Sequence, residues 1–575
     1  MHRGGNSELP PHLCDPELVN VNFVDVGRYI VPVDENLLNY YVRNCVDNNS
    51  MFNFRYVTDL DIYDAVSNVR SRATGCDNIS LDMLLFSLPF MISVLRDIFN
   101  DCLCGGQFPE SWKRAVVKPL PKVPNPSTLS DLRPISILSV CSKIFEKVVF
   151  KMMSEYIASR GLLPSIQSGF RANYSTCTAL LKVTTELSAA MDQSKVACLV
   201  LLDYSKAFDL INHELLLAKL SFLGFSEQSV KWFKSYLHGR TQIVDINGLR
   251  SGPSGVPFGV PQGSILGPVL FTLFTFDIES VISHCSTHLY ADDTQLVKLI
   301  DPMSSTSDIV ALNEDLQRLA TWSANHGLIL NTRKCCLLFV GTPHMRMKMR
   351  VNTFVTVHIN GTEIVEKEYS KNLGIMFDNN LNFEKHVSNR ISSVYMKLKS
   401  LYAYKSLLDE SIKYRLIEAT IFPLIDYCLP MYFSFLTLEF RNKLQLAQNS
   451  CVRFAYSIRK FDHISPTFNT HCILKVPFRY KLHLGVLVKG ILDKKEPSYL
   501  YEMFVPRNII HNLNLRGMHF DIKPHRTAGF EACFSYVAVK LINNSEFRIM
   551  AQNLSKPRFR SKYKNMLLAQ QIAEV

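Results

Sequence analysis

The stretch HLYADDTQLV, residues 288–297, places two carboxylates side by side, Asp292 and Asp293, in a segment that alternates like a β-hairpin. Neighbouring carboxylates repel each other, and in a partly buried site one of them takes up a proton unless a cation lies between them. Asp203 is a third such residue, because it directly follows the apolar run VACLVLL, residues 196–202, which is typical of a strand covered on both faces. Three carboxylates at one edge of a sheet would form the oxygen cluster that hard divalent cations prefer.

Each of these residues also has a purely structural explanation. An Asp doublet is normal in a polar hairpin turn, and an Asp after a strand commonly caps the next segment. The chemical explanation is a pair of metal ions about 3.5–4 Å apart, which is a general device for in-line phosphoryl transfer. The choice between the two depends on the rest of the chain.

The composition favours a large protein with a polyanionic partner. The 575 residues are 47% hydrophobic, which predicts several domains, and the formal net charge of +12 favours nucleic acid over a membrane. The longest apolar run, residues 265–282, is interrupted by Pro268, Asp277 and Glu279 and predicts a buried helix. The N-terminus lacks the apolar core of a secretory signal, so we expect a protein of the reducing cell interior that is not secreted.

The elements that must position the acidic residues follow from periodicity. Residues 1–50 are rich in Pro, Asn and Asp and predict a loosely structured lead-in, after which Thr58 caps a first helix. Residues 112–126 predict a strand with a basic hairpin, and MRMKMRV, residues 345–351, a second basic hairpin. Further helices are expected at 81–104, 138–161, 176–193, 212–223, 308–327, 386–404, 409–429 and 439–458, and another helix after 223 that ends at 237.

Three motifs bring the acidic residues into a known context. LLDYSKAFD, GVPQGSILGP and YADD, in this order and at these spacings, resemble the central polymerase motifs of reverse transcriptases. The flanking segments SDLRPISILSVCSKIFEKVV, SIQSGFRANYSTCTALL, LNTRKCCLLFVG and NLGIMF resemble the accessory blocks of non-LTR, LINE-type retrotransposons, especially the jockey-like group. The resemblance covers about residues 55–455.

The resemblance implies an α+β, right-hand polymerase fold with fingers, a palm built on an antiparallel sheet, and a helical thumb. The expected organisation is a lead-in (1–54), a helical N-terminal extension (55–104), a reverse transcriptase domain (105–377), a helical thumb and connection (378–470), and a C-terminal region with a basic tail (471–575).

The resemblance also implies roles for individual residues. Asp203 and Asp292 would hold two Mg²⁺ ions, for which Mn²⁺ could substitute, and Asp293 would assist. Phe208 would crowd the sugar 2′ position, with a core aromatic as the structural alternative. Gln262 and Gly263 would form the loop that packs against the nascent base pair, or else an ordinary turn into a helix.

Five further residues would contact the substrate. Lys122 and Arg133 would grip the incoming triphosphate, unless they belong to a solvated basic hairpin. Lys334 would protonate the departing pyrophosphate, unless it is a surface lysine. Arg171 and Tyr290 complete the expected substrate-binding set.

The implied activity is RNA-directed DNA synthesis, with an RNA template, a DNA primer or target, and dNTPs, in a ribonucleoprotein of the nucleus and cytoplasm. We expect no endonuclease module upstream, so that target nicking needs a separate endonuclease. No Cys-His knuckle is apparent, which leaves template binding to the helical region and to the tail KPRFRSKYK, where Phe559 and Tyr563 would stack on single-stranded RNA. A departure from the family, Phe276 in TFDIE, leaves open a non-catalytic, RNA-binding remnant or domesticated copy.

Overall fold

The computed structural model describes residues 9–25, 33–45, 51–353, 355–507 and 519–574. The chain divides into two compact units that each draw on separate stretches of sequence. The first unit comprises Met1–Pro164, Tyr204–Ile282 and Gln317–Asn331; the second comprises Ser165–Asp203, Ser283–Leu316 and Thr332–Val575. The chain therefore passes from the second unit to the first directly after Asp203.

The first unit contains a five-stranded sheet whose central strand is β1 (Arg114–Pro121). β1 is antiparallel to β2 (Leu132–Ile137) and parallel to β5 (Thr241–Ile246), so that Val116 lies between Ile137 and Ile243. The remaining strands of the sheet are β6 (Leu249–Arg250) and β7 (Ser254–Gly255). A separate pair is formed by β4 (Tyr204–Ser205) and β10 (Ile329–Leu330). The strand predicted within residues 112–126 is confirmed as β1.

Eight helices, listed here by bounds, cover the described parts of the first unit: α1 (Pro16–Val24), α2 (Glu35–Arg43), α3 (Asp59–Ser67), α4 (Leu81–Gly105), α5 (Val140–Arg160), α7 (His213–Phe222), α8 (Glu227–Leu237) and α9 (Gly267–Phe274). Thr58 caps α3 in a capping box with Asp61, as its position before an apolar pattern predicts. α5 ends at Gly161, whose φ of 60° is the left-handed conformation that glycine adopts without strain.

The prediction of a loosely structured lead-in is wrong for the described part of residues 1–50. Asp15 caps α1 and Pro16 occupies its first turn, a combination that stabilises a helix start. Val19 and Phe23 of α1 are buried in a small core with Val117 and Val244 of the sheet. Residues 1–8, 26–32 and 46–50 lie outside the described residues.

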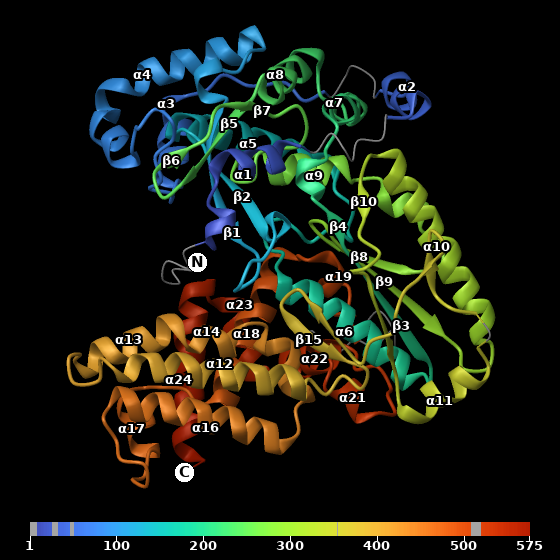
Figure 1. Cartoon of the computed structure of the whole chain (residues 1–575). Coiled ribbons are helices and arrows are strands. Elements are labelled where there is room, and N and C mark those ends of the chain that lie inside the picture. Colours follow the sequence, from blue (N-terminus) through green and yellow to red (C-terminus); the bar gives the residue numbers. More distant parts are fainter. Residues whose placement is uncertain (1–8, 26–32, 46–50, 354, 508–518, 575) are drawn as a thin grey trace. The chain divides into compact units, whose positions relative to one another are not determined.

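The second unit contains a four-stranded antiparallel sheet in the order β11-β3-β9-β8 (Figure 1). Its strands are β3 (Val196–Leu202), β8 (Ser286–Tyr290), β9 (Asp293–Ile300) and β11 (Cys336–Val340). α6 (Thr176–Asp192) packs against β3, β8 and β9. Because β3 is covered in this way, six of its seven residues are buried, as its unbroken apolar run predicts.

The rest of the second unit is mostly helical. Between β9 and β11 the chain forms α10 (Ser305–Asn325), whose residues up to Leu316 belong to the second unit and whose remaining residues belong to the first. Two short hairpins are formed by β12 (His358–Ile359) with β13 (Thr362–Glu363) and by β14 (Tyr369–Asn372) with β15 (Ile375–Asp378). The helices that follow are α12 (Glu384–Tyr402), α13 (Glu410–Thr420), α14 (Phe422–Asp426), α15 (Leu429–Tyr432), α16 (Leu438–Ala455), α17 (Ser465–Thr470), α18 (Val476–Lys494), α19 (Ser498–Tyr501), α21 (Ala528–Glu531), α22 (Phe534–Asn543), α23 (Ser545–Asn553) and α24 (Lys556–Ala573).

The prediction of a basic hairpin at residues 345–351 is wrong, because this segment belongs to the helix α11 (Pro343–Val351). The side chain of Thr342 accepts a hydrogen bond from Met345 N, and Pro343 stands in the first turn. A capping side chain followed by proline is typical of a helix start. The predicted hairpin depended only on the alternation of apolar and basic residues over seven positions.

Within the described part of the chain, one segment, Glu410–Phe435, is long and apolar enough to cross a membrane by length and composition alone. In its most apolar window, 56% of the residues are buried inside the structure, and the segment is divided among α13, α14 and α15. Buried core helices pass the same test, so this single segment is weak evidence for a membrane span.

Candidate active site

The register of the second sheet places the three predicted carboxylates at one edge. Leu202, the last residue of β3, pairs with Thr294 of β9, so Asp203 emerges beside the start of β9. Across the β8–β9 turn, Tyr290 pairs with Asp293. Asp203, Asp292 and Asp293 therefore lie at the same end of the sheet, although Leu202 and Tyr290 are 88 positions apart in the sequence.

The electrostatics of this acidic edge are unfavourable for three ionised carboxylates. Burial, followed by the charges of Asp292 and Asp203, raises the pKa of Asp293 to about 6, while part of its side chain remains exposed. Lys334 is the nearby predicted cation, with its Nζ 3.7 Å from Oδ2 of Asp203. Because 66% of the Lys334 side chain is exposed, water screens this pair and it relieves little of the repulsion.

In the part of the chain that the structure describes, no three His, Cys, Asp or Glu side chains are arranged closely enough to hold a metal ion. The acidic edge nevertheless has the chemistry of a divalent-cation site. Its donors are carboxylate oxygens, the ligands that Mg²⁺ prefers, and a cation bound by them would remove the repulsion that raises the pKa of Asp293.

Arg171 and Tyr290 belong to the same unit as the acidic edge. Tyr290 is half-buried beside Asp293, and burial, with smaller effects of Cys428 and Asp293, raises the pKa of its hydroxyl. Arg171 lies 4.3 Å above the ring of Tyr174 and donates a hydrogen bond of 3.3 Å to the carbonyl of Gln167. Gln167, which the sequence did not single out, contacts the turn that carries the aspartate doublet.

The remaining predicted residues lie in the first unit. Gln262 donates hydrogen bonds of 2.9 and 3.0 Å to the two carboxylate oxygens of Asp209, and its carbonyl accepts from Ser136 N at 2.8 Å. Gly263 has a φ of 133°, and a Cβ there would stand 2.3 Å from the Ser136 carbonyl oxygen. The glycine of this loop is therefore required by its approach to β2, a close backbone contact of the kind only glycine permits.

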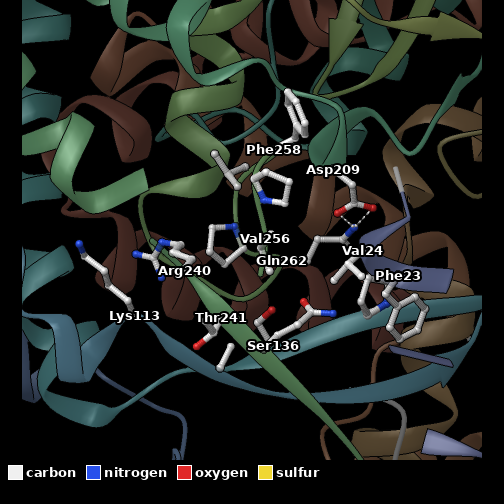
Figure 2. A pocket seen from close by; sticks show the side chains of 16 residues that line it. Phe23, Val24, Lys113, Ser136, Asp209, Arg240, Thr241, Val256, Phe258 and Gln262 are labelled. Carbon is white, nitrogen blue, oxygen red and sulfur yellow. Dashed lines mark hydrogen bonds between the residues drawn. The ribbon is translucent and has the colours of Figure 1, made fainter. Parts of the chain in front are cut away.

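Asp209 is the acidic residue of the first unit that sequence reasoning missed. Figure 2 shows it bonded to Gln262 in a pocket whose other lining residues include Arg240 and Ser136. Burial raises the pKa of Asp209, whereas Gln262 and the charges of Lys206, Lys122 and Arg133 act in the opposite direction. Lys122 and Arg133, which the sequence predicts to bind a triphosphate, thus act on the carboxyl group of Asp209 by lowering its pKa.

Lys122 directly follows β1 and Arg133 lies in β2, and both are exposed. The Nζ of Lys122 donates a hydrogen bond of 2.9 Å to the Ser130 carbonyl. Phe208 lies in a short 3-10 helix, Ala207–Asp209, and its ring stacks on Phe271 with centroids 4.5 Å apart. The roles predicted for these three residues remain predictions.

Phe276, the departure from the expected motif, is accommodated by aromatic packing. Its ring contacts Phe222 at 5.9 Å and Tyr41 of α2 at 6.5 Å, centroid to centroid. Lys219 Nζ lies 5.3 Å from the Phe276 centroid. Phe276 therefore packs in an ordered aromatic neighbourhood of the first unit.

The predicted stacking of Phe559 and Tyr563 on RNA is wrong. Both residues lie in α24, where Phe559 is 0% and Tyr563 2% exposed, and their rings pack on each other and on Phe547. Their spacing of four residues puts them on one face of a helix, which is the face that packs inward. The five basic residues of this segment remain exposed: Lys556, Arg558, Arg560, Lys562 and Lys564.

Comparison with known families identifies the class of the domain. Residues 121–377 match the family described as reverse transcriptase (RNA-dependent DNA polymerase). This range contains the acidic edge, the Gln262–Gly263 loop, and strand β2 with the loop that precedes it. This part of the chain is therefore similar to reverse transcriptases.

Within that class the sequence is related to proteins of jockey-like, non-LTR mobile elements. It is 28% identical over 374 residues to the RNA-directed DNA polymerase from mobile element jockey of Drosophila melanogaster, a match covering 63% of this chain and 40% of that protein. It is also 28% identical over 351 residues to the probable RNA-directed DNA polymerase from transposon BS of the same species, covering 59% and 38%. The matched part thus spans about two fifths of these relatives.

Proposed function

We propose that this protein is an RNA-directed DNA polymerase that copies retrotransposon RNA into cDNA by adding deoxynucleotides to a primer 3′-OH, at a nicked target. The observation that carries the proposal is the acidic edge, Asp203 with Asp292 and Asp293, inside the matched reverse transcriptase domain. In this proposal the fold is a right hand, with the β11-β3-β9-β8 sheet as its palm.

The three carboxylates would hold the divalent cations, Mg²⁺ in the first place. When bound, such ions activate the attacking hydroxyl and neutralise charge on the leaving group. The chain itself orients the carboxylate oxygens, because Asp203 is fixed by the end of β3 and the doublet by the β8–β9 turn. Lys334, 3.7 Å from Asp203, would give a proton to the departing pyrophosphate.

The proposed partners are an RNA template and a DNA primer. The net charge of +12 supports binding to phosphates, which releases counterions and makes affinity fall steeply with salt. The exposed cations of α24 would contribute to this binding through charge alone, since their aromatic neighbours are buried.

Primer extension on an RNA template tests the proposal. Asp292→Asn should lower the rate of extension by about three orders of magnitude, because it removes a metal-binding oxygen, and should leave RNA binding nearly unchanged. Asp101→Asn, the same substitution at an exposed position of α4, is the matched control and should extend normally. An unmodified chain that binds RNA but extends no primer would instead identify a non-catalytic remnant.

We further propose that Phe208 excludes ribonucleotides by contact with the 2′-OH. Steric exclusion depends on side-chain volume, so Phe208→Ala should lower the ratio of kcat/KM for dNTP over rNTP. The stacking on Phe271 suits a ring held in a defined orientation. A residue that only packs would lower both activities together, and an unchanged ratio would remove Phe208 from substrate selection.

A further inference from the structure

The loop Ser165–Phe170 pairs with strand β8 next to the aspartate doublet. Leu289 N donates to the Ile166 carbonyl at 3.0 Å, and Ser168 N donates to the Leu289 carbonyl at 2.8 Å. These bonds form a parallel bridge between Gln167 and Leu289, all within the second unit. The loop therefore extends the sheet beside the strand that leads into the YADD turn.

The side chain of Gln167 reaches from this loop to the turn itself. Its Oε1 accepts hydrogen bonds from Ala291 N at 3.0 Å and from Gly169 N at 2.7 Å, and its Nε2 lies 3.5 Å from the Ala291 carbonyl. Gln167 is 1% exposed, so water does not compete for these bonds. Ala291 has a φ of 58°, a left-handed conformation that is unfavourable for a residue with a Cβ.

The backbone of the loop lies directly against the same turn. A Cβ at Gly169 would stand 2.3 Å from Ala291 N, so only glycine permits this approach. The Gln167 side chain and the Gly169 backbone therefore both contact the backbone of Ala291, the residue that immediately precedes Asp292.

A segment from the C-terminal region holds the loop in turn. The hydroxyl of Tyr499, on α19, lies 2.8 Å from Ser168 Oγ and 3.4 Å from Thr178 Oγ1. Tyr499 is buried, and its ring packs edge-on against Tyr174 at 5.7 Å. The hydroxyl thus joins the loop to the first turn of α6 from a position more than 320 residues further along the chain.

We infer that Gln167 is a positioning residue that keeps the turn at Ala291 in its left-handed form and so aims Asp292 and Asp293, and that Tyr499 secures this clamp from the C-terminal region. The inference rests on the proposed polymerase function for its consequence, but the clamp itself is a property of the fold. A turn without the clamp would sample other conformations, and small displacements of reacting groups cost large factors in rate.

Amide hydrogen exchange tests the clamp without any reference to activity. Gln167→Met keeps the length and bulk of the side chain but removes the acceptor for Ala291 N. Exchange in the segment 288–293 should become faster in this variant. Gln193→Met, at the exposed C-terminal end of α6, is the matched control and should leave exchange in that segment unchanged. Unchanged exchange in Gln167→Met would overturn the clamp.

Primer extension tests the consequence for catalysis. Gln167→Met should lower kcat by about ten- to a hundredfold with little change in the KM for dNTP. Ala291→Gly added to Gln167→Met should restore part of the lost rate, because glycine adopts the left-handed conformation without support. A general loss of folding would not be restored in this way, so absence of restoration would overturn the positioning role.

Tyr499→Phe removes only the hydroxyl and should cause a smaller change in the same direction in both measurements. Tyr501→Phe, on the same short helix, is its control. If Gln167→Met does not fold, the Tyr499 pair decides the inference by exchange in the same segment. If the unmodified protein extends no primer, the proposed function fails, and exchange alone still decides whether the clamp exists.

Discussion

The pKa values of Asp277 in the first unit and of Asp293 in the second unit move in opposite directions, although burial acts on both carboxyl groups. Burial alone would raise both. For Asp277, His326 and Lys219 reverse the effect and hold the pKa well below its usual range. For Asp293, the neighbours are two further carboxylates, which add to the effect of burial and bring the pKa to about 6.

Asp277 forms an ion cluster with the ammonium group of Lys219 and the hydroxyl of Tyr41. Lys219 is 0% exposed and places its Nζ 2.7 Å from Asp277 Oδ1, while the hydroxyl of Tyr41 donates to Oδ2. Four rings surround the Lys219 Nζ at 5.1–5.5 Å from their centroids: Tyr41, Phe274, Phe276 and Trp322. Burial lowers the pKa of Lys219 to about 8 although Asp277 acts against this, so the pair offsets a desolvation cost rather than adding a large gain.

The difference separates an acid that is paired within the fold from an acid that lies among other carboxylates. Asp277 has its cation within the fold and joins α2, α7 and the segment after α9. The acidic edge has one exposed lysine near Asp203, and its charge favours a cation supplied from outside.

Removal of one carboxylate from the acidic edge should abolish function without weakening the fold. Asp203→Asn should lower the rate of primer extension by about three orders of magnitude, because several kcal/mol of transition-state stabilisation are lost. Thermal unfolding, measured by circular dichroism, should stay the same or shift upward, since a repulsive charge is removed. A large fall in melting temperature would show that the acidic edge is structural and would end the contrast.

Removal of the Lys219 cation from the ion cluster should weaken the fold instead of acting on the acidic edge. Lys219→Met leaves Asp277 buried without its main partner and should destabilise the first unit by about 3–5 kcal/mol. All three tryptophans, at 112, 232 and 322, lie in the first unit, so urea unfolding followed by their fluorescence reports on it.

The matched control is Lys234→Met, on the exposed face of α8, which should have little effect. Adding Asp277→Asn to Lys219→Met should recover part of the loss, because the unpaired charge is then removed. Losses that simply add would show that the two residues act independently.

A divalent cation should stabilise the second unit through its acidic edge. Mg²⁺ at ten times its dissociation constant should contribute about 1.4 kcal/mol to stability by mass action, seen as an upward shift in melting temperature. The shift should shrink in Asp292→Asn and persist in Lys219→Met under conditions where that variant is folded. An equal shift in Asp292→Asn would locate the cation elsewhere.

The smallest expected effect is the pH dependence of the ion cluster. Burial, with a further contribution from Lys219, lowers the pKa of His326 below its usual value of about 6.5 despite Asp277. The unfolded chain then takes up a proton that the folded chain does not as pH falls below about 6.5, so stability is lost on acidification, by at most about 1.4 kcal/mol per pH unit. Between pH 7.5 and 5.5 the urea midpoint should fall less in His326→Gln than in the unmodified protein. Equal falls would exclude His326.

Short-range features of the structure could be predicted from the sequence. The apolar run that ends at Asp203, the hairpin at Asp292, the cap at Thr58 and the stop at Gly161 are all observed. Each depends on residues within a few positions of one another, where periodicity, capping and the freedom of glycine act directly.

Two predictions were wrong although local signals for the correct structure were present in the sequence. Thr342 and Pro343 indicate a helix start, but the short alternation of apolar and basic residues after them favoured a hairpin. Phe559 and Tyr563, four apart, with Leu567 four further on, mark the buried face of a helix, but the cations between them favoured an exposed tail. In both cases a pattern of period two competed with one of period 3.6, and the longer pattern prevailed because it lets an apolar face pack.

Contacts between distant residues were decided by the tertiary structure alone. Gln167 meets Ala291 across 124 positions, and Lys219 meets Asp277 across 58. Neither pair has a local signature, because a glutamine or a lysine is compatible with exposure until the chain encloses it. By itself the sequence of this protein determined which acids stand at the ends of strands. The fold decided which acid received a cation of its own and which remained beside other carboxylates, because burial and the identity of the neighbours set the sign of each pKa shift.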